Sequence, residues 1–431
     1  MTEAWTTQVV TEALTFPTSL AFDDAGRMYV AEAGLPFGGA PAGGRVWRIE
    51  PDGGRVLLAD RLSPPVNGLT HHRGDLIVSV GGQPSQILRL SLDGRTETLV
   101  GGLPGPGNYQ TNMAVVGPDE KLYFSQGAMT NSGIIGLDAY EIGWLARLPH
   151  SHDLPGFELE LTGVNLRTAN PLAPDGGEVE TGAFVPFGTS TRRGQRVPAE
   201  LPCTAAVMRC ALDGSNLELV AWGLRNAYGL GFLPDGRLLA IDQGADDRGS
   251  RPIGNAPDLL YEVRPDAWFG WPDFIGGEPV TDGRFVPQRG PAPTFLLANH
   301  HELPPPQPPL VAFGPHTAAV KFDVGPGEQL FVALFGDEAP MTGPPAEPVG
   351  RSVVRVDLDR GEVHAVAAGP FDRPIDIRFS PEGALHVLDF GRFEMTERGV
   401  EAQPRTGKVY RLQAEERTKT TKSERGSDER R

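Results

Sequence analysis

One phrase recurs six times along this chain: a short apolar strand, a polar turn that contains Gly or a Pro-Asp/Glu pair, and a second apolar strand. The copies begin at Ser19, Gly68, Met113, Gly229, Val320 and Ile375. A third apolar segment follows each copy, and a fourth follows several of them. Alternating apolar and polar residues are typical of strands that pack between neighbouring sheets. Four antiparallel strands per unit, repeated radially, predict an all-β fold, a six-bladed β-propeller.

The last copy lacks a fourth strand, because its third strand ends at Leu412 and a charged tail follows. The segment TTQVVTEALTFP, from Thr6, has the pattern and spacing of the fourth strand GRVLLADRLSPP, from Gly54. We therefore expect the N-terminal strand to complete the last blade and close the ring. Residues 1–412 then form a single propeller domain, and the almost wholly polar tail 413–431 is expected to be disordered.

Two long segments interrupt the copies, at roughly 128–202 and 272–308. Both are rich in Gly, Pro and polar residues, and loops of this length are usually functional or mobile. We expect both long loop insertions to cover the same mouth of the channel, as a lid.

The formal net charge of −16 argues against nucleic acid and anionic membrane surfaces as partners, because both require basic patches. No apolar run approaches the roughly 20 residues that a membrane helix needs. The N-terminal segment MTEAWTTQVVTEALTF lacks the basic start and apolar core of a signal peptide, which predicts a cytoplasmic protein.

Residues just before the first strand of each blade should ring one mouth of the channel. Counting back from equivalent second-strand positions places Tyr109, Arg225 and Asp372 in one register, and Gln110, Asn226 and Arg373 in the next. Two inward arginines in an acidic chain suggest an anionic ligand, since guanidinium groups bind carboxylates in a bidentate geometry. The alternative is that each arginine pairs with a local acid such as Asp372.

The segment that follows the fourth copy is rich in acids and turn carbonyls. Its acids are Asp242, Asp246, Asp247 and Asp258. Calcium takes hard oxygen ligands of this kind, but acid-rich turns are also commonly just solvated. This segment by itself leaves both interpretations open.

Two phrases around this segment, WGLRNAYGLGFLPDGRLLAIDQGADD and APDLLYEVRPDAWFGWPDF, resemble the soluble glucose/sorbosone dehydrogenase family. The similarity extends from about Phe16 to Leu412. The resemblance implies a six-bladed propeller that uses pyrroloquinoline quinone (PQQ) and calcium. It implies an oxidoreductase that oxidises a sugar or alcohol hydroxyl by hydride transfer to the quinone and then passes electrons to an unknown acceptor. Members of that family are usually exported.

The resemblance also assigns roles to residues by position. It implies that PQQ contacts Gln110, Arg225, Asn226, Thr317, Arg373 and Asp389, and that calcium binds the carbonyls of Gly244 and Ala245 together with Asp258. The chain departs from the family pattern at four places. Tyr109 stands where the family has its base histidine, Ala128 replaces the acid that orients it, Ile375 replaces a second quinone-binding arginine, and no cofactor-binding lysine is found near Gly336.

Tyr109 is therefore the candidate catalytic base. A tyrosine with the reference pKa of about 10 is ionised in roughly one molecule per thousand at pH 7, and a nearby Arg225 is expected to lower that pKa. We expect slow or absent sugar oxidation. Two alternatives stay open: a non-catalytic ligand-binding propeller, and a calcium-dependent lactonase-type hydrolase. For the latter, Asn67, Asn112 and Asn226 could point inward, but no inward glutamate is apparent.

Overall fold

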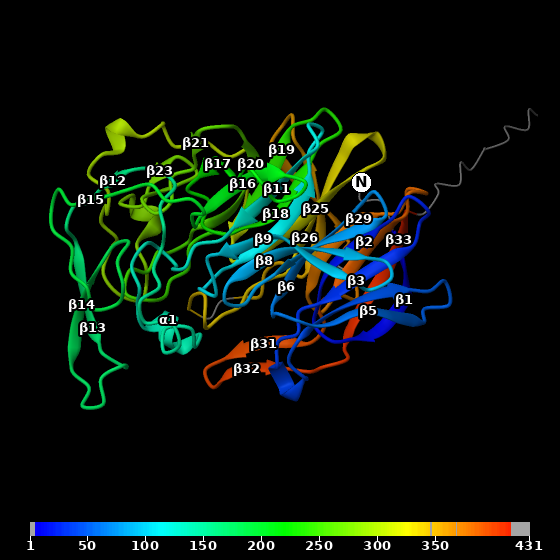
Figure 1. Ribbon diagram of the computed structural model, residues 1–431, viewed down its shortest axis with the longest axis horizontal. Coiled ribbons are helices and arrows are strands. Elements are labelled where there is room, and N and C mark those ends of the chain that lie inside the picture. Colours follow the sequence, from blue (N-terminus) through cyan, green and yellow to red (C-terminus); the bar gives the residue numbers. More distant parts are fainter. Residues whose placement is uncertain (1–4, 345–346, 368, 415–431) are drawn as a thin grey trace, which may run out of the picture.

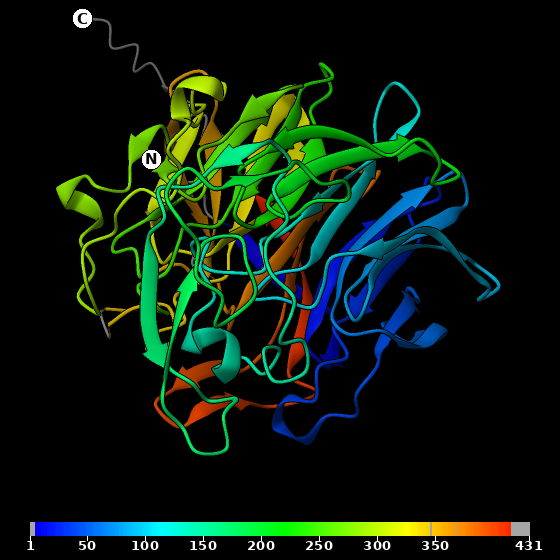
Figure 2. The ribbon, with the colours of Figure 1, turned by 60° about the vertical axis from the view of Figure 1, so that its left-hand side comes forward.

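Six sheets, each built from four antiparallel strands, follow one another around a common axis (Figure 1, Figure 2). The computed structural model describes residues 5–344, 347–367 and 369–414. The first blade contains β2 (Pro17–Phe22), β3 (Met28–Glu32), β4 (Gly44–Ile49) and β5 (Arg55–Leu62). The second contains β6 (Val66–His72), β7 (Asp75–Val80), β8 (Ser85–Ser91) and β9 (Thr96–Leu103). The third contains β10 (Thr111–Val116), β11 (Lys121–Gln126), β16 (Ala206–Ala211) and β17 (Glu218–Trp222).

The other three blades follow the same plan. The fourth contains β18 (Ala227–Phe232), β19 (Leu238–Asp242), β20 (Pro257–Val263) and β24 (Val311–Pro315). The fifth contains β25 (Ala319–Gly325), β26 (Gln329–Leu334), β27 (Ser352–Asp357) and β28 (Glu362–Ala367). The sixth contains β29 (Pro374–Phe379), β30 (Leu385–Asp389), β33 (Gly407–Ala414) and β1 (Trp5–Leu14). The predicted fold, a six-bladed β-propeller, is confirmed.

The burial pattern explains why these segments form strands. The second strands β3, β11 and β30 are buried along nearly their whole length, because neighbouring blades cover both of their faces. Such strands read as continuous apolar runs. The outer strand β5 alternates between exposed and partly buried positions, as a strand with one solvated face does. The first strands pack in a closed order around the axis: β2, β6, β10, β18, β25, β29 and again β2.

The ring is closed by β1, which pairs antiparallel with β33 from Trp5 opposite Ala414 to Leu14 opposite Gly407. Leu14 is fully buried, so the N-terminal strand also contributes to the core of the last blade. The predicted closure is confirmed. β33 runs to Ala414, and the remainder of the predicted tail, residues 415–431, lies outside the described residues.

A buried ion pair ties several blades together on the axis. Lys321 is 1% exposed, and its Nζ donates to the backbone carbonyls of Thr18 (2.7 Å) and Asn67 (2.6 Å). The same Nζ lies 3.7 Å from the Asp376 carboxylate, which accepts from the backbone N–H of Leu20. Burial lowers the pKa of Lys321 to about 8, and Asp376 opposes that effect. These contacts join the first, second, fifth and sixth blades below one mouth of the channel.

The first insertion leaves the third blade after β11. It contains α1 (Leu137–Glu141), β12 (Leu159–Glu160), β13 (Asn165–Ala169), β14 (Glu178–Gly182) and β15 (Arg196–Val197). Figure 1 shows β12, β15, β13 and β14 on the side of the molecule away from β1 and β5. Among the described residues, no helix has the length and apolar character needed to cross a bilayer.

The second insertion separates β20 from β24 and adds β21 (Ala267–Trp268), β22 (Phe274–Ile275) and β23 (Glu278–Pro279). β21 pairs in parallel with β17, so the third blade gains a fifth strand. The two insertions contact each other through the bridge between Leu161 and Leu297. Of the residues in the two insertions, Asp138, Glu141, Ile142 and Arg289 line the cavity described below, so the predicted lid is limited to these residues.

The closure gives a first prediction. Deleting residues 1–14 should leave β33 as an unpaired edge strand, which is an aggregation hazard, and should remove a buried part of the core. We expect insoluble protein or a melting temperature lower by several degrees, measured by differential scanning calorimetry. A deletion of residues 1–4, which ends before β1, is the control. Equal melting of the full and the 1–14-deleted chains would contradict the role of β1.

Candidate functional site

A cavity of about 1090 Å³ lies at one mouth of the channel. Its lining includes residues in or next to the first strand of every blade: Thr18, Asn67, Asn112, Tyr228, Ala318 and Ile375. Further lining residues come from longer loops: Asp138, Arg248, Arg289, Glu338 and Arg398. The hairpin of β31 (Phe393–Thr396) and β32 (Gly399–Ala402) lies beside α1 in both ribbon views, and both contribute to the lining (Figure 1, Figure 2). This size suits a small-molecule ligand.

Seven of the ten residues predicted for the site line this cavity, and three do not. The seven are Tyr109, Gln110, Arg225, Asn226, Gly244, Ala245 and Asp258. Thr317, Arg373 and Asp389 are absent from the lining. The predicted mouth register therefore brings its residues together in the third and fourth blades, whereas Asp372 and Arg373 of the sixth blade do not reach the cavity.

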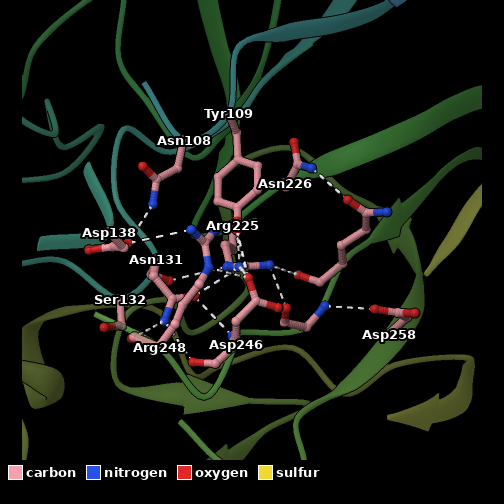
Figure 3. A network of polar contacts seen from close by, with 12 residues as sticks. Asn108, Tyr109, Asn131, Ser132, Asp138, Arg225, Asn226, Asp246, Arg248 and Asp258 are labelled. Atoms are coloured by element: carbon pink, nitrogen blue, oxygen red, sulfur yellow. Dashed lines mark hydrogen bonds and ion pairs between the residues drawn. The ribbon is translucent and has the colours of Figure 1, made fainter. Parts of the chain in front are cut away.

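Arg225 is buried, and all three of its guanidinium nitrogens donate to protein acceptors (Figure 3). Nη2 donates to the Asp246 carboxylate at 2.6 Å, to Asn131 Oδ1 at 2.8 Å and to the Tyr109 hydroxyl. Nη1 donates to the carbonyls of Gln243 and Gly244, and Nε donates to the Asn131 carbonyl. The pairing with a local acid, the alternative left open above, is thus what the structure shows for Arg225.

Asp246 holds a second buried guanidinium as well. Arg248 Nε donates to Asp246 Oδ2 at 2.9 Å, and Arg248 Nη2 donates to the Tyr109 hydroxyl at 2.9 Å. Burial acts to raise the pKa of Asp246, but Arg225 and Arg248 outweigh it and keep that pKa below its usual value. Arg248 Nη1 lies 3.6 Å from Asp138 Oδ2 and has no hydrogen-bond partner among the described residues.

Tyr109 is held in this network as a neutral phenol. Its hydroxyl donates to Asp246 Oδ2 at 3.2 Å and accepts from the two arginines (Figure 3). Burial raises the pKa of Tyr109 well above its ordinary value, and the nearby Arg225 charge does not reverse this. Arg225 acts to lower the pKa of Tyr109, as expected, but desolvation is the larger effect and the net shift is upward. Tyr109 is therefore poorly suited to act as a base at neutral pH.

Two of the three predicted calcium ligands, the Gly244 carbonyl and Asp258, are engaged by the protein itself. The Gly244 carbonyl accepts from Arg225, so a guanidinium stands where a cation was predicted. Asp258 accepts from the Gly244 N–H at 2.9 Å, from the Thr317 hydroxyl at 3.0 Å and from the Ala319 N–H at 2.8 Å. Burial raises the pKa of Asp258. The described part of the chain contains no group of three or more His, Cys, Asp or Glu residues placed to hold a metal ion.

Asp242 and Asp389 share one structural role in different blades. Each ends a second strand and accepts from backbone N–H groups of the turn before its blade's first strand: Asp242 from Arg225 and Asn226, Asp389 from Asp372 and Arg373. Burial raises the pKa of Asp242 to about 7 and that of Asp389 to about 6. Asp389 thus stabilises the turn before the first strand of its blade, as Asp242 does in the fourth blade.

Arg373 also has a structural setting. It is 1% exposed, and its Nη2 donates to Glu394 at 2.7 Å. Nε and Nη1 donate to the carbonyls of Phe393 and Asp337. Arg373 therefore links the loop after β26 to the β31–β32 hairpin, which explains why its guanidinium does not face the cavity.

The sequence patterns did not indicate several residues of the site, chiefly Asn131, Arg248, Glu338 and Thr342. Glu338 corrects the expectation that no glutamate points inward, because it lines the cavity. One signal could have found it: Asp337 and Glu338 follow the second strand of the fifth blade, as the site segment 243–248 follows the second strand of the fourth. Asn131 lies in the first insertion, where no repeat gives a register.

These contacts decide whether the residues present suit PQQ and calcium. PQQ is a polycarboxylate, so its site must offer cations with donors to spare. Arg225 is saturated by protein acceptors, Arg373 lies outside the cavity, and Arg248 keeps one nitrogen, Nη1, without a partner among the described residues. The Gly244 and Asp258 oxygens already accept protein donors. The lining contains six carboxylates (Asp138, Glu141, Asp246, Asp258, Glu338, Glu397) but four arginines (Arg225, Arg248, Arg289, Arg398). In this arrangement the residues do not fit PQQ and calcium.

The network gives a second prediction. Asp246→Asn should destabilise the fold by about 3–5 kcal/mol, because it leaves two buried guanidinium groups without their carboxylate. The matched control is Asp235→Asn, since Asp235 pairs with Arg237 at 2.7 Å on the exposed surface. An exposed pair of this kind contributes little to stability, because water and salt screen it. Urea unfolding of both variants measures the difference, and equal losses would contradict the role given to Asp246.

Comparison with known proteins supports the fold. No protein-family model matches the chain, and no curated protein sequence matches it either. Solved structures do match over nearly the full length of both chains. An oxidoreductase (glucose dehydrogenase) from Thermus thermophilus has 18% identity and a TM-score of 0.56, with 95% of this chain and 100% of that chain covered.

Two other structures are similar to the same degree. The PQQ-bound aldose sugar dehydrogenase from Streptomyces coelicolor has 15% identity and a TM-score of 0.57, with coverage of 95% and 98%. A calcium structure of a Trichoderma reesei carbohydrate-active enzyme of family AA12 has 16% identity and a TM-score of 0.57, with 96% of each chain covered. The similarity to these three structures therefore covers the whole fold.

Proposed function

We propose that the protein binds a neutral, sugar-sized polyhydroxy compound in the axial cavity. The observation that carries this proposal is the saturation of Arg225 by Asp246, Asn131 and Tyr109, which leaves that arginine no donor for an anionic ligand. The similar fold of sugar dehydrogenases supports a sugar as the ligand class.

The neutral polar groups of the lining suit such a ligand. Gln110 Oε1 is buried and has no hydrogen-bond partner among the described residues. Amides of Asn67, Asn112 and Asn226 also line the cavity. Their nitrogens donate to protein acceptors, and the amide oxygens of Asn67 and Asn112 can accept from ligand hydroxyl groups. The rings of Phe335, Phe390 and Phe393 supply apolar lining beside them. A polyol needs both kinds of surface, because its hydroxyl groups must be satisfied and its C–H faces covered.

Oxidation of a bound sugar with PQQ is the second candidate. The observation in its favour is that seven of the ten positions assigned by resemblance converge on one cavity. It requires Arg225 to leave Asp246 and turn toward the quinone. We do not propose the hydrolase, because its calcium would need the Asn226 amide oxygen, which already accepts from Asn112 Nδ2 at 2.8 Å.

One titration separates the two candidates. We expect D-glucose, D-xylose or D-sorbitol to produce saturable binding heat in calorimetry. PQQ with calcium chloride should leave the visible spectrum of the quinone unchanged and should support no dye reduction with these sugars. A protein-bound quinone spectrum together with dye reduction would establish the second candidate instead. Absence of heat with all three sugars would contradict the proposal.

The buried amide gives a more local prediction. Gln110→Leu removes an acceptor and a donor from the cavity, and we expect the affinity for the bound sugar to fall about two- to tenfold, the value of one neutral hydrogen bond. Gln329→Leu, at the exposed start of β26, is the matched control and should bind as the unchanged protein does. Equal affinities for all three proteins would remove Gln110 from the site.

A further inference from the structure

Glu338 lies in a short turn that hydrogen bonds hold against the wall of the cavity. The N–H groups of Met341 and Thr342 donate to the Glu338 carbonyl at 2.9 Å and 3.3 Å. The Thr342 carbonyl accepts from the Asp247 N–H at 2.8 Å, and Arg289 donates to the carbonyl of Pro340. The turn therefore packs directly on the segment that carries Asp246 and Arg248.

The Glu338 carboxylate has no hydrogen bond or ion pair with any described residue, although it lines the cavity and is half-buried. Of the other five lining carboxylates, Glu141 and Glu397 are exposed, and the remaining three are engaged. Asp138 accepts from Asn108, Asp246 from two arginines, and Asp258 from backbone N–H groups and Thr317. Two donors of the same wall also lack hydrogen-bond partners within the described residues, namely Arg248 Nη1 and Thr342 Oγ1, and both residues are lining residues.

We infer that Glu338 is the ligand-contacting carboxylate of the cavity, where its ionised form accepts a hydrogen bond from a ligand hydroxyl while Arg248 Nη1 and Thr342 Oγ1 donate to ligand oxygens. This inference rests on the proposed function and specifies its site. A carboxylate with neighbouring donors matches a vicinal diol, whose hydroxyl groups both donate and accept. The acceptor and the donors come from adjacent loops, so the ligand would bridge the fourth and fifth blades.

The position of Glu338 makes binding depend on pH. Burial raises the pKa of Glu338 to about 7, Arg373 and Arg248 act to lower it, and Asp246 and Asp337 add to the rise. The charged and titratable groups whose electrostatic effects reach Glu338 are Arg373, Asp246, Arg248, Asp337 and Tyr228, and His316 lines the same cavity. Below pH 7 the carboxyl is mostly protonated and is a weaker acceptor than the carboxylate. Sugar affinity should therefore rise as pH increases through 7.

The test is calorimetric titration with D-glucose, D-xylose and D-sorbitol from pH 5.5 to 8.5, on the unchanged protein, Glu338→Gln and Glu200→Gln. Glu200 is an exposed residue that does not line the cavity, and it serves as the matched control. We expect the unchanged protein and Glu200→Gln to bind about fivefold more tightly at the upper pH, the difference between a charged and a neutral acceptor. Glu338→Gln should bind weakly, with no slope against pH.

Thermal melting without ligand checks the titration of Glu338 itself. Because its folded-state pKa lies above the unfolded value of about 4.5, ionisation destabilises the fold, and the stability contributed by the protonated group is lost as pH rises toward 7. Glu338→Gln should therefore melt higher than the unchanged protein at pH 8, and the gap should shrink toward pH 5.

The outcomes separate the two proposals. Sugar binding by Glu338→Gln with unchanged affinity and pH slope would overturn the assignment of Glu338 and leave the proposed function intact. Failure of the unchanged protein to bind any of the three sugars at any pH would overturn the proposed function and this inference with it. A melting gap that does not vary with pH would show that Glu338 does not titrate in this range and would also overturn the inference.

Discussion

The pairing of β1 with β33 is the constraint on which the rest of this molecule depends. It makes the last blade from both ends of the chain, so the six sheets close into a ring without an exposed edge at the seam. Closure sets the first strands of all blades around one axis, and the turns that precede those strands then meet at one mouth. The cavity is a consequence of this geometry, and the Lys321–Asp376 pair links four blades beneath it.

Within that mouth, Asp246 determines what the cavity can accept. One carboxylate neutralises two buried guanidinium groups and holds the Tyr109 hydroxyl beside them. A charge buried without a partner is costly, so the arginines stay with Asp246 unless a ligand offers equivalent contacts. The same fold can thus present a cationic site or a neutral one according to whether its arginines are already paired. Here the paired state leaves amides, aromatic rings and Glu338 to contact a ligand.

The repeat explains how much could be predicted from the sequence. Blades, closure and the convergence of Tyr109, Gln110, Arg225 and Asn226 follow from strand register, which a period of apolar residues fixes. Strand register does not determine the direction that a long side chain takes. Register therefore placed Arg373 in the cavity, whereas its guanidinium binds Glu394. The effect of burial could not be predicted from the sequence either. The pKa of Tyr109 is raised by desolvation, which depends on all the groups packed around its ring. Glu338 lies in a loop outside the repeat phrase.

The central proposal is that Arg225 stays paired with Asp246 and that the cavity binds a neutral polyol. The most direct measurement is a crystal structure of the protein soaked together with PQQ, calcium chloride and D-glucose. We expect density for the sugar beside Gln110 and Glu338, with the Arg225 guanidinium still paired with Asp246. Density for a quinone in the cavity, with Arg225 turned away from Asp246 toward the quinone carboxylates, would contradict the assignment of a neutral ligand.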